Sequence, residues 1–154
     1  MQRRRARTGN LFRGMADLRE SMIYRWLAAG DAGELDTFDD LLLPDAVIHA
    51  PRGLSTTSRE AEKAVWQAAL AAMPDLRHHV REVLVDRDIE MARVVVTGTM
   101  AAAFAGVEGS GRSFQMDQAV IVHLRDGRIE EAWEIADVAA LERQVTRAKQ
   151  ADAK

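Results

Sequence analysis

Four carboxylates lie within eight residues near the carboxyl-terminal end of the chain, and a tryptophan stands among them. The stretch reads RIEEAWEIADVAAL over residues 128–141, with Glu130, Glu131, Glu134 and Asp137 around Trp133. A carboxylate that faces water only makes the surface of a strand polar, whereas a carboxyl group in an apolar cavity can donate and accept protons near neutral pH. The faces on which these side chains lie therefore decide whether the segment holds an acid/base group.

A regular strand that begins at Arg128 places alternate side chains on opposite faces. We expect the face that carries Trp133 to line a cavity, with Asp137 as the acid at the end of that row. Asp137 also directly precedes VAALERQV, so capping of a following helix is the competing interpretation. We expect Glu130 and Glu134 to face water. The predicted cavity row consists of Ile129, Glu131, Trp133, Ile135 and Asp137.

Composition limits the other kinds of chemistry. The 154 residues contain no cysteine, which excludes disulfides, thiolate nucleophiles and cysteine metal sites. His78 and His79 are adjacent, so a regular strand sends them to opposite faces, and we expect no metal site. The net charge is −3, but five arginines without an acid lie within residues 1–14, so the rest of the chain carries −8. An acidic body repels phosphate backbones, so we expect no nucleic-acid partner.

The basic residues 1–14 are expected to be a disordered tail, and residues 15–149 a single domain. Only Leu11 and Phe12 stand where a secretory signal needs a longer apolar run, and no apolar stretch approaches the ~20 residues that span a bilayer. We therefore expect a soluble, cytoplasmic protein without a membrane partner.

Helical spacing of apolar residues predicts three helices in the first half of the domain, over 17–29, 33–43 and 61–73. Gly30 is expected to stop the first helix and Pro44 the second. Thr57 and Glu60 are expected to form a capping box at the start of the third.

A period of two then predicts four strands, over 77–85, 91–104, 113–124 and 128–136, after a short extended piece at 46–50. Asp126 and Gly127 are expected to form the turn before the last strand, and a helix over 138–149 closes the chain. This order predicts an α+β fold, in which N-terminal helices pack on a curved antiparallel sheet and leave a central pocket.

Several motifs, in this order, resemble the SnoaL-like polyketide cyclases, which belong to the superfamily of nuclear transport factor 2 and ketosteroid isomerase. They are YRWLAAGD, FDDLLLPDAVIHAP, MPDLRHHV, VVVTGTMAAAFAG, SGRSF and DGRIEEAWEIADVAALERQ. The resemblance covers about residues 17–145. The resemblance implies a cone-shaped fold with a mostly apolar pocket, and a homodimer formed through the outer face of the sheet. It also implies aldol ring closure of a polyketide by an acidic residue, without metal or cofactor.

The resemblance also implies roles for particular residues. Asp137 matches the acid of the family's terminal W-x3-D pattern, although the family also favours an acid directly after that tryptophan. A bulge in the strand would therefore bring Glu134 into the pocket instead. His49 matches a histidine that borders the pocket, where an imidazole can donate to a carbonyl or orient a carboxylate. His123 is a further candidate for contact with the ligand.

The remaining pocket candidates are mostly apolar. Relatives often read TGTHxGxF, whereas this chain reads TGTMAAAF, so Met100 replaces a histidine and makes the rim less polar. Met100, Phe104 and Phe114 are expected either to bind an apolar ligand or to belong to the core. Leu27 and Gln67 match positions that approach the substrate in relatives.

Two other classes of function remain open. The cone can serve as a non-catalytic domain that binds a small apolar ligand or dimerises. It can also belong to another enzyme of the superfamily. An isomerase needs a pocket tyrosine, and the sole candidate is Tyr24, near the edge of the first helix's apolar face. An epoxide hydrolase needs two acids beside a water, for which Glu131 and Asp137 are the candidates.

Overall fold

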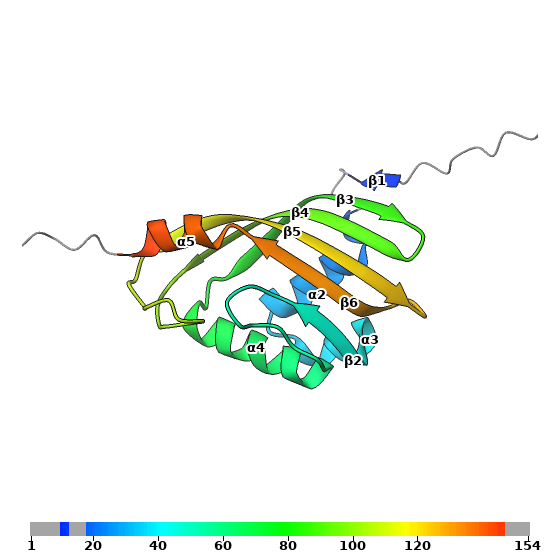
Figure 1. Cartoon of the computed structure of the whole chain (residues 1–154), viewed down its shortest axis with the longest axis horizontal. Coiled ribbons are helices and arrows are strands. Elements are labelled where there is room, and N and C mark those ends of the chain that lie inside the picture. The colour runs from blue at the N-terminus through cyan, green and yellow to red at the C-terminus, as the bar shows by residue number, and fades with distance from the viewer. Residues whose placement is uncertain (1–9, 13–17, 147–154) are drawn as a thin grey trace, which may run out of the picture.

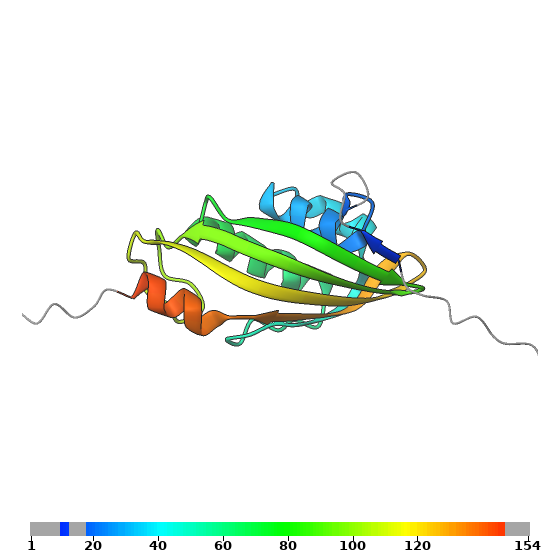
Figure 2. The ribbon, with the colours of Figure 1, turned by 90° about the horizontal axis from the view of Figure 1, so that it is seen from above.

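The computed structural model describes residues 10–12 and 18–146 of the protein (Figure 1). A curved sheet forms one layer, and helices pack on one of its faces, as the α+β prediction requires (Figures 1 and 2). Its six strands lie in the order β1-β3-β4-β5-β6-β2. They are β1 (Asn10–Phe12), β2 (Leu42–His49), β3 (Arg77–Asp86), β4 (Ile89–Thr99), β5 (Ser113–Arg125) and β6 (Arg128–Ala136).

The strands β3 to β6 form an antiparallel meander, as expected, but the two edges of the sheet were not predicted. β2 pairs with β6 in parallel, and β1 adds to β3. Most of the expected disordered tail, residues 1–14, lies outside the described residues. Within it, residues 10–12 are a strand rather than part of a disordered segment.

The helices are α2 (Met22–Asp31), the short 3-10 helix η1 (Leu35–Thr37), α3 (Phe38–Leu41), α4 (Arg59–Ala72) and α5 (Val138–Val145). The predicted helix over 33–43 is therefore too long, because β2 begins at Leu42 and runs through Pro44. Proline lacks a backbone N–H, and it is tolerated here because β2 is an edge strand. The last helix ends at Val145, and residues 147–149 of its predicted range lie outside the described residues.

Gly30 does not stop the first helix. It is buried within α2, and a Cβ there would lie 2.4 Å from the ring of Trp66, so the glycine lets α2 and α4 approach closely. Gly33, with a φ of 71°, supplies the left-handed residue after the helix end. At the start of α4 the cap is Ser58, whose hydroxyl accepts from the N–H of Ala61, and not the expected Thr57.

The core lies between the helices and the inner face of the sheet. Ile23, Trp26 and Leu27 of α2 are fully buried, and they face valines of β4 and β5. Each such side chain contributes roughly 1.5–3 kcal/mol when it leaves water. Glu90 of β4 is also buried, and its carboxylate accepts from the N–H groups of Met22 and Ile23 at 3.0 and 3.1 Å. This carboxylate fixes the start of α2 against the sheet.

Candidate functional site

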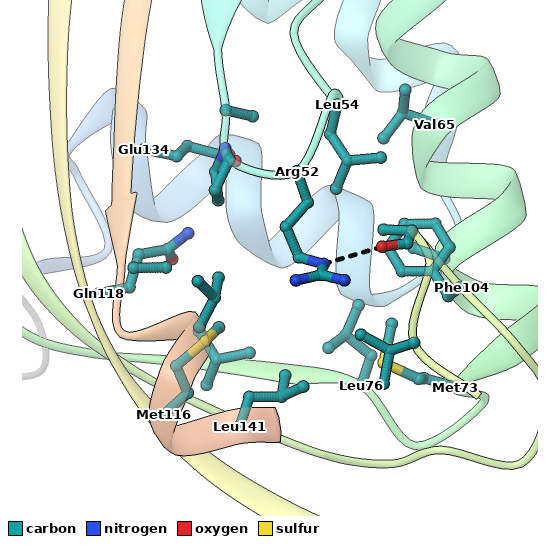
Figure 3. A pocket seen from close by; sticks show the side chains of 18 of the residues that line it. Arg52, Leu54, Val65, Met73, Leu76, Phe104, Met116, Gln118, Glu134 and Leu141 are labelled. Carbon is teal, nitrogen blue, oxygen red and sulfur yellow. Dashed lines mark hydrogen bonds between the residues drawn. The ribbon is translucent and has the colours of Figure 1, made fainter. Parts of the chain in front are cut away.

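A cavity of about 140 Å³ opens between α4, the inner face of the sheet and α5 (Figure 3). Most of its wall is apolar. α4 contributes Val65 and Ala69, β5 contributes Met116, and the mouth is bordered by Leu54 and Leu141. The cavity therefore suits a small apolar ligand, and the few polar groups in its wall decide what chemistry is available.

A bulge in β6 decides which acid enters this cavity. His123 of β5 pairs with Glu131 but Leu124 pairs with Ile129, so Glu130 is the extra residue on β6. Beyond the bulge the alternation of side chains is reversed relative to the turn. Glu134 consequently lines the cavity, and Figure 3 shows its side chain directed inward from the sheet. The expectation that Glu134 faces water is wrong, and the bulged alternative is the one observed.

The environment of Glu134 disfavours its charged form. Its side chain is half-buried at the cavity wall, and no described residue makes a hydrogen bond or ion pair with it. Loss of hydration, followed by the negative charge of Glu62, raises the pKa of Glu134 to about 8. At neutral pH most molecules therefore carry a neutral acid in the cavity wall. Such a group can donate a hydrogen bond to a carbonyl and can accept a proton once it is ionised.

Glu62 of α4 is a second acid in the cavity wall, and it is only 3% exposed. Its two oxygens accept from Trp66 Nε1 at 3.1 Å and from Thr56 Oγ1 at 2.8 Å. Burial raises the pKa of Glu62, and these two donors oppose the rise. Glu62 has two donors that favour its charged form and Glu134 has none, so the neutral form is favoured more strongly on Glu134.

Gln118 of β5 is the third polar group of the inner wall. It pairs with Ala136, so it lies diagonally across from Glu134 on the same face of the sheet. The side chain is 7% exposed, and its Oε1 has no hydrogen-bond partner. Figure 3 shows Gln118 and Glu134 projecting from the same wall. A hydroxyl of a ligand placed between them would satisfy both side chains, because it can donate to Oε1 of Gln118 and accept from the neutral acid of Glu134.

Arg52 holds together the segments around the mouth of the cavity. Its Nε donates to the carbonyl of Ala105 at 2.8 Å, the bond drawn as a dashed line in Figure 3. Its Nη1 contacts Glu142 of α5. Arg52 and Ala105 both have positive φ values, 58° and 50°, which are unfavourable for residues with a Cβ. The loops before α4 and after β4 are thus joined to α5 at one guanidinium.

The predicted placement of Asp137 in the cavity is wrong. Its exposed carboxylate accepts from the N–H of Ala140 at 3.1 Å and caps α5, which was the competing interpretation. Trp133 and His123 are also outside the cavity, as is His49. His49 stacks on Trp133 with ring centres 5.2 Å apart and lies 3.0 Å from Glu131, all on the outer face of the sheet.

The apolar candidates divide into two groups. Met100, Phe104 and Phe114 line the cavity, and two of them, Met100 and Phe114, are also part of the buried core. Leu27 is fully buried in the core and does not reach the cavity. Gln67 is exposed on the outer side of α4.

Sequence reasoning missed Glu62, Gln118, Arg52 and His78, which all line the cavity. Two of them carried a readable signal. Gln118 is the polar member of an alternating row that otherwise holds Phe114, Met116, Val120 and Val122. Glu62 lies at helical spacing with Trp66, Ala69 and Met73.

Two further observations concern other kinds of site. Among residues 10–12 and 18–146, no group of three or more His, Asp or Glu side chains is arranged to hold a metal ion. None of the described helices has the length and apolar character needed to cross a membrane.

Similar proteins share this fold over most of the chain. IdmH from Streptomyces antibioticus, a proposed polyketide cyclase, is 34% identical, with a TM-score of 0.70 over 80% of this chain and 94% of its own. TsrD from Streptomyces laurentii, 23% identical, has a TM-score of 0.74 over 86% and 96%. A SnoaL-like polyketide cyclase from Agrobacterium tumefaciens, 19% identical, has a TM-score of 0.70 over 84% and 98%.

No curated protein matches the chain. The family model of the SnoaL-like polyketide cyclases matches residues 21–145, which contain every helix and strand described above except β1. This match confirms the resemblance seen in the motifs, and the protein belongs to the SnoaL-like polyketide cyclase family.

Proposed function

We propose that the protein closes a ring of a small polyketide-like substrate by intramolecular aldol reaction, with Glu134 as the acid/base group. The observation that carries this proposal is the position of Glu134 in an apolar cavity, without a protein partner and with its pKa raised to about 8. A general acid/base works best when its pKa is close to the working pH. Membership of the cyclase family and the similarity to IdmH support the same reaction.

The proposed reaction uses one proton that leaves the substrate and returns to it. Ionised Glu134 removes a proton from a methylene that lies between two carbonyls, and an enolate forms. The enolate carbon attacks a second carbonyl carbon of the same molecule, and one carbon–carbon bond forms. Glu134 then returns the proton to the new alkoxide. The reaction needs no oxidant or reductant, and we propose that it proceeds without a cofactor.

Gln118 is proposed to hold the reacting carbonyl. Its amide lies diagonally across from Glu134, where Nε2 can donate to a carbonyl oxygen of the substrate and Oε1, which lacks a partner, can accept from a hydroxyl. The apolar wall would fold the substrate so that the methylene and the carbonyl approach each other.

The test compares wild-type protein with Glu134→Gln and Glu131→Gln. Glu131 lies on the same strand but on the outer face, so it is a matched control. With candidate polyketide β-diketones, we expect Glu134→Gln to decrease the cyclisation rate by a factor of ~10²–10⁴ while ligand affinity changes little. The new ring is detected by absorbance and NMR. Wild-type rates in Glu134→Gln would disprove the assignment.

The second proposal is a domain that binds a small apolar ligand without changing it. The observation that favours it is the apolar rim, in which Met100 stands fully buried where relatives often carry histidine. Recovery of the bound ligand decides between the two proposals. A ligand that is always returned unchanged supports the binding domain, and a cyclised product supports the enzyme.

We also propose that two copies associate through the outer face of the sheet. Four large apolar side chains are exposed there, and Ile135 is 60% exposed. Burial of such a patch is a common reason for association. We expect Met91→Lys to convert a dimer to a monomer in analytical ultracentrifugation. A wild-type protein that is monomeric at all concentrations would refute this proposal. The exposed set is Leu84, Ile89, Met91 and Ile135.

A further inference from the structure

A histidine with a fixed ring orientation lines the cavity and is not used by the proposed reaction. His78 of β3 has its Nδ1 2.7 Å from Asp31 Oδ1 at the end of α2. The other oxygen of Asp31 accepts from the backbone N–H of His78 at 2.7 Å. Both side chains are 9% exposed. The ring of Trp66 packs beside the imidazole, with centres 5.2 Å apart. The imidazole therefore has one orientation.

These contacts decide the hydrogen-bonding character of the free ring nitrogen. A carboxylate can only accept, so the Nδ1 of His78 carries the hydrogen that Asp31 binds. In the neutral ring Nε2 is then an acceptor. None of the described residues bonds to this Nε2, although the side chain lines the cavity. An acceptor in an otherwise apolar wall suits a ligand that brings a donor.

The position of His78 complements that of Glu134. His78 projects from β3, whereas Glu134 projects from β6, so three strand-to-strand steps separate the two across the sheet. Below pH 8 the carboxyl of Glu134 is mostly neutral and presents a hydrogen-bond donor to the cavity. The Nε2 of His78 presents a hydrogen-bond acceptor. A ligand that reaches both therefore needs an oxygen acceptor at one end and a hydroxyl at the other.

We propose that His78, oriented by Asp31, accepts a hydrogen bond from a hydroxyl group of the ligand, so that the substrate carries a hydroxyl group at this end in addition to the carbonyl at the other. The inference rests on the proposed function only in assigning the same cavity to the substrate. His78 thus helps to select ligands that carry a hydroxyl group, and Asp31 is a positioning residue that acts through His78.

The test uses two probes that differ in a single group, 1-naphthol and 1-methoxynaphthalene. Their ratio of dissociation constants, followed by probe fluorescence with the full chain, reports the hydroxyl contact and needs no reaction. A net hydrogen bond corresponds to roughly a two- to tenfold preference for 1-naphthol in wild-type protein. His78→Phe keeps an aromatic ring but removes both ring nitrogens, and it should reduce the preference to about onefold.

Asp31→Asn provides a sharper readout. The oxygen of an amide at position 31 would accept from the backbone N–H of His78, and its NH₂ would face Nδ1. The imidazole hydrogen then moves to Nε2, which becomes a donor. We expect the preference for 1-naphthol to disappear or to reverse toward 1-methoxynaphthalene. If the Asp31–His78 pair only stabilised the fold, the variant would weaken the binding of both probes equally and leave the ratio of their dissociation constants unchanged.

The matched control is His79→Phe, because His79 is exposed on the other face of β3 and its Nε2 contacts Thr97. This variant should keep the wild-type ratio. An unchanged ratio in both His78→Phe and Asp31→Asn would overturn the proposal, as would wild-type protein that binds neither probe. Loss of cyclisation in Glu134→Gln reports the other proposal, so the two can fail separately.

Discussion

Glu134 and Trp133 are neighbours in the chain and lie on opposite faces of β6. Glu134 lines the cavity, whereas Trp133 stacks on His49 at the outer face. The acid is consequently separated from every histidine of the outer face by the thickness of the sheet. Groups that can act with Glu134 must come from the cavity wall, where the titratable and charged ones are Glu62, His78 and Arg52.

The first prediction concerns stability as a function of pH. The folded state holds the pKa of Glu134 at about 8, above its ordinary value of 4.5, so folded protein binds the proton more tightly than unfolded protein. The contribution of Glu134 to the free energy of unfolding should therefore be greatest below pH 4.5 and should be lost as the pH rises to about 8. The slope for one proton is about 1.4 kcal/mol per pH unit.

Urea unfolding of wild-type protein and Glu134→Gln between pH 5 and pH 9 measures this slope. We expect the variant to lack the decline and to be more stable than wild type at the alkaline end, because it has no charge to bury. Parallel curves for the two proteins would show that Glu134 does not titrate in this window. Glu131→Gln, on the outer face, should follow wild type.

Glu62→Gln tests the interaction between the two buried acids. The variant removes the negative charge that helps to raise the pKa of Glu134, so that pKa should fall but stay above 4.5, because burial is the larger cause. The amide also satisfies one of the two donors that Glu62 now binds, and the unpaired donor costs roughly 1–2 kcal/mol of stability. The pKa is measured from the infrared band of the protonated carboxyl. An upward shift or no shift would contradict the interaction.

Asp137→Ala separates the capping role from a catalytic one. Loss of the side chain that accepts from Ala140 should lower the free energy of unfolding by ~1 kcal/mol. Asp137→Ser, which retains a capping oxygen, should recover most of it. Neither variant is expected to change cyclisation or probe binding, since Asp137 does not line the cavity. A large loss of rate in the stable Asp137→Ser variant would restore Asp137 as the acid.

Arg52→Ala tests how the mouth of the cavity opens. If these loops separate when a ligand enters, loss of the contacts of Arg52 with Ala105 and Glu142 should accelerate association and dissociation of 1-naphthol. Contacts of this kind correspond to roughly a three- to thirtyfold change in rate. Arg112→Ala, in the loop between β4 and β5, is the control. If only dissociation accelerates, Arg52 is a ligand contact and not a closure of the mouth.

Periodicity in the sequence was sufficient for most of the fold. The alternation in β5 is found where it was predicted. The Asp126-Gly127 turn is also found there, and both of its residues have positive φ values. The edges were not predictable in the same way, because a parallel partner for β2 leaves no local signal. Gly30 shows the same limit, since its role depends on Trp66, which is 36 residues away.

The site was harder to predict than the fold because large apolar residues lie on both faces of β6. Trp133 and Ile135 were assigned to the cavity, but they belong to the outer face. The inner row contains Ala132, which is buried in the core, and Glu134 and Ala136, which line the cavity. A regular strand gives the first assignment and a bulged strand the second. The preference of the family for an acid after the tryptophan was the signal that pointed to the bulge.

The extra residue at Glu130 has a consequence for how such cavities change over evolutionary time. Ile129 pairs with Leu124 and Glu131 pairs with His123, so the bulge accommodates one additional residue without shifting the pairing of any later position of β6. Deletion of Glu130 would therefore give a regular ladder and leave Glu134 in the cavity and Trp133 on the outer face. A gain or loss of one codon at this point is thus tolerated by the site, whereas a one-residue slip of the pairing itself would exchange the acid for an aromatic ring.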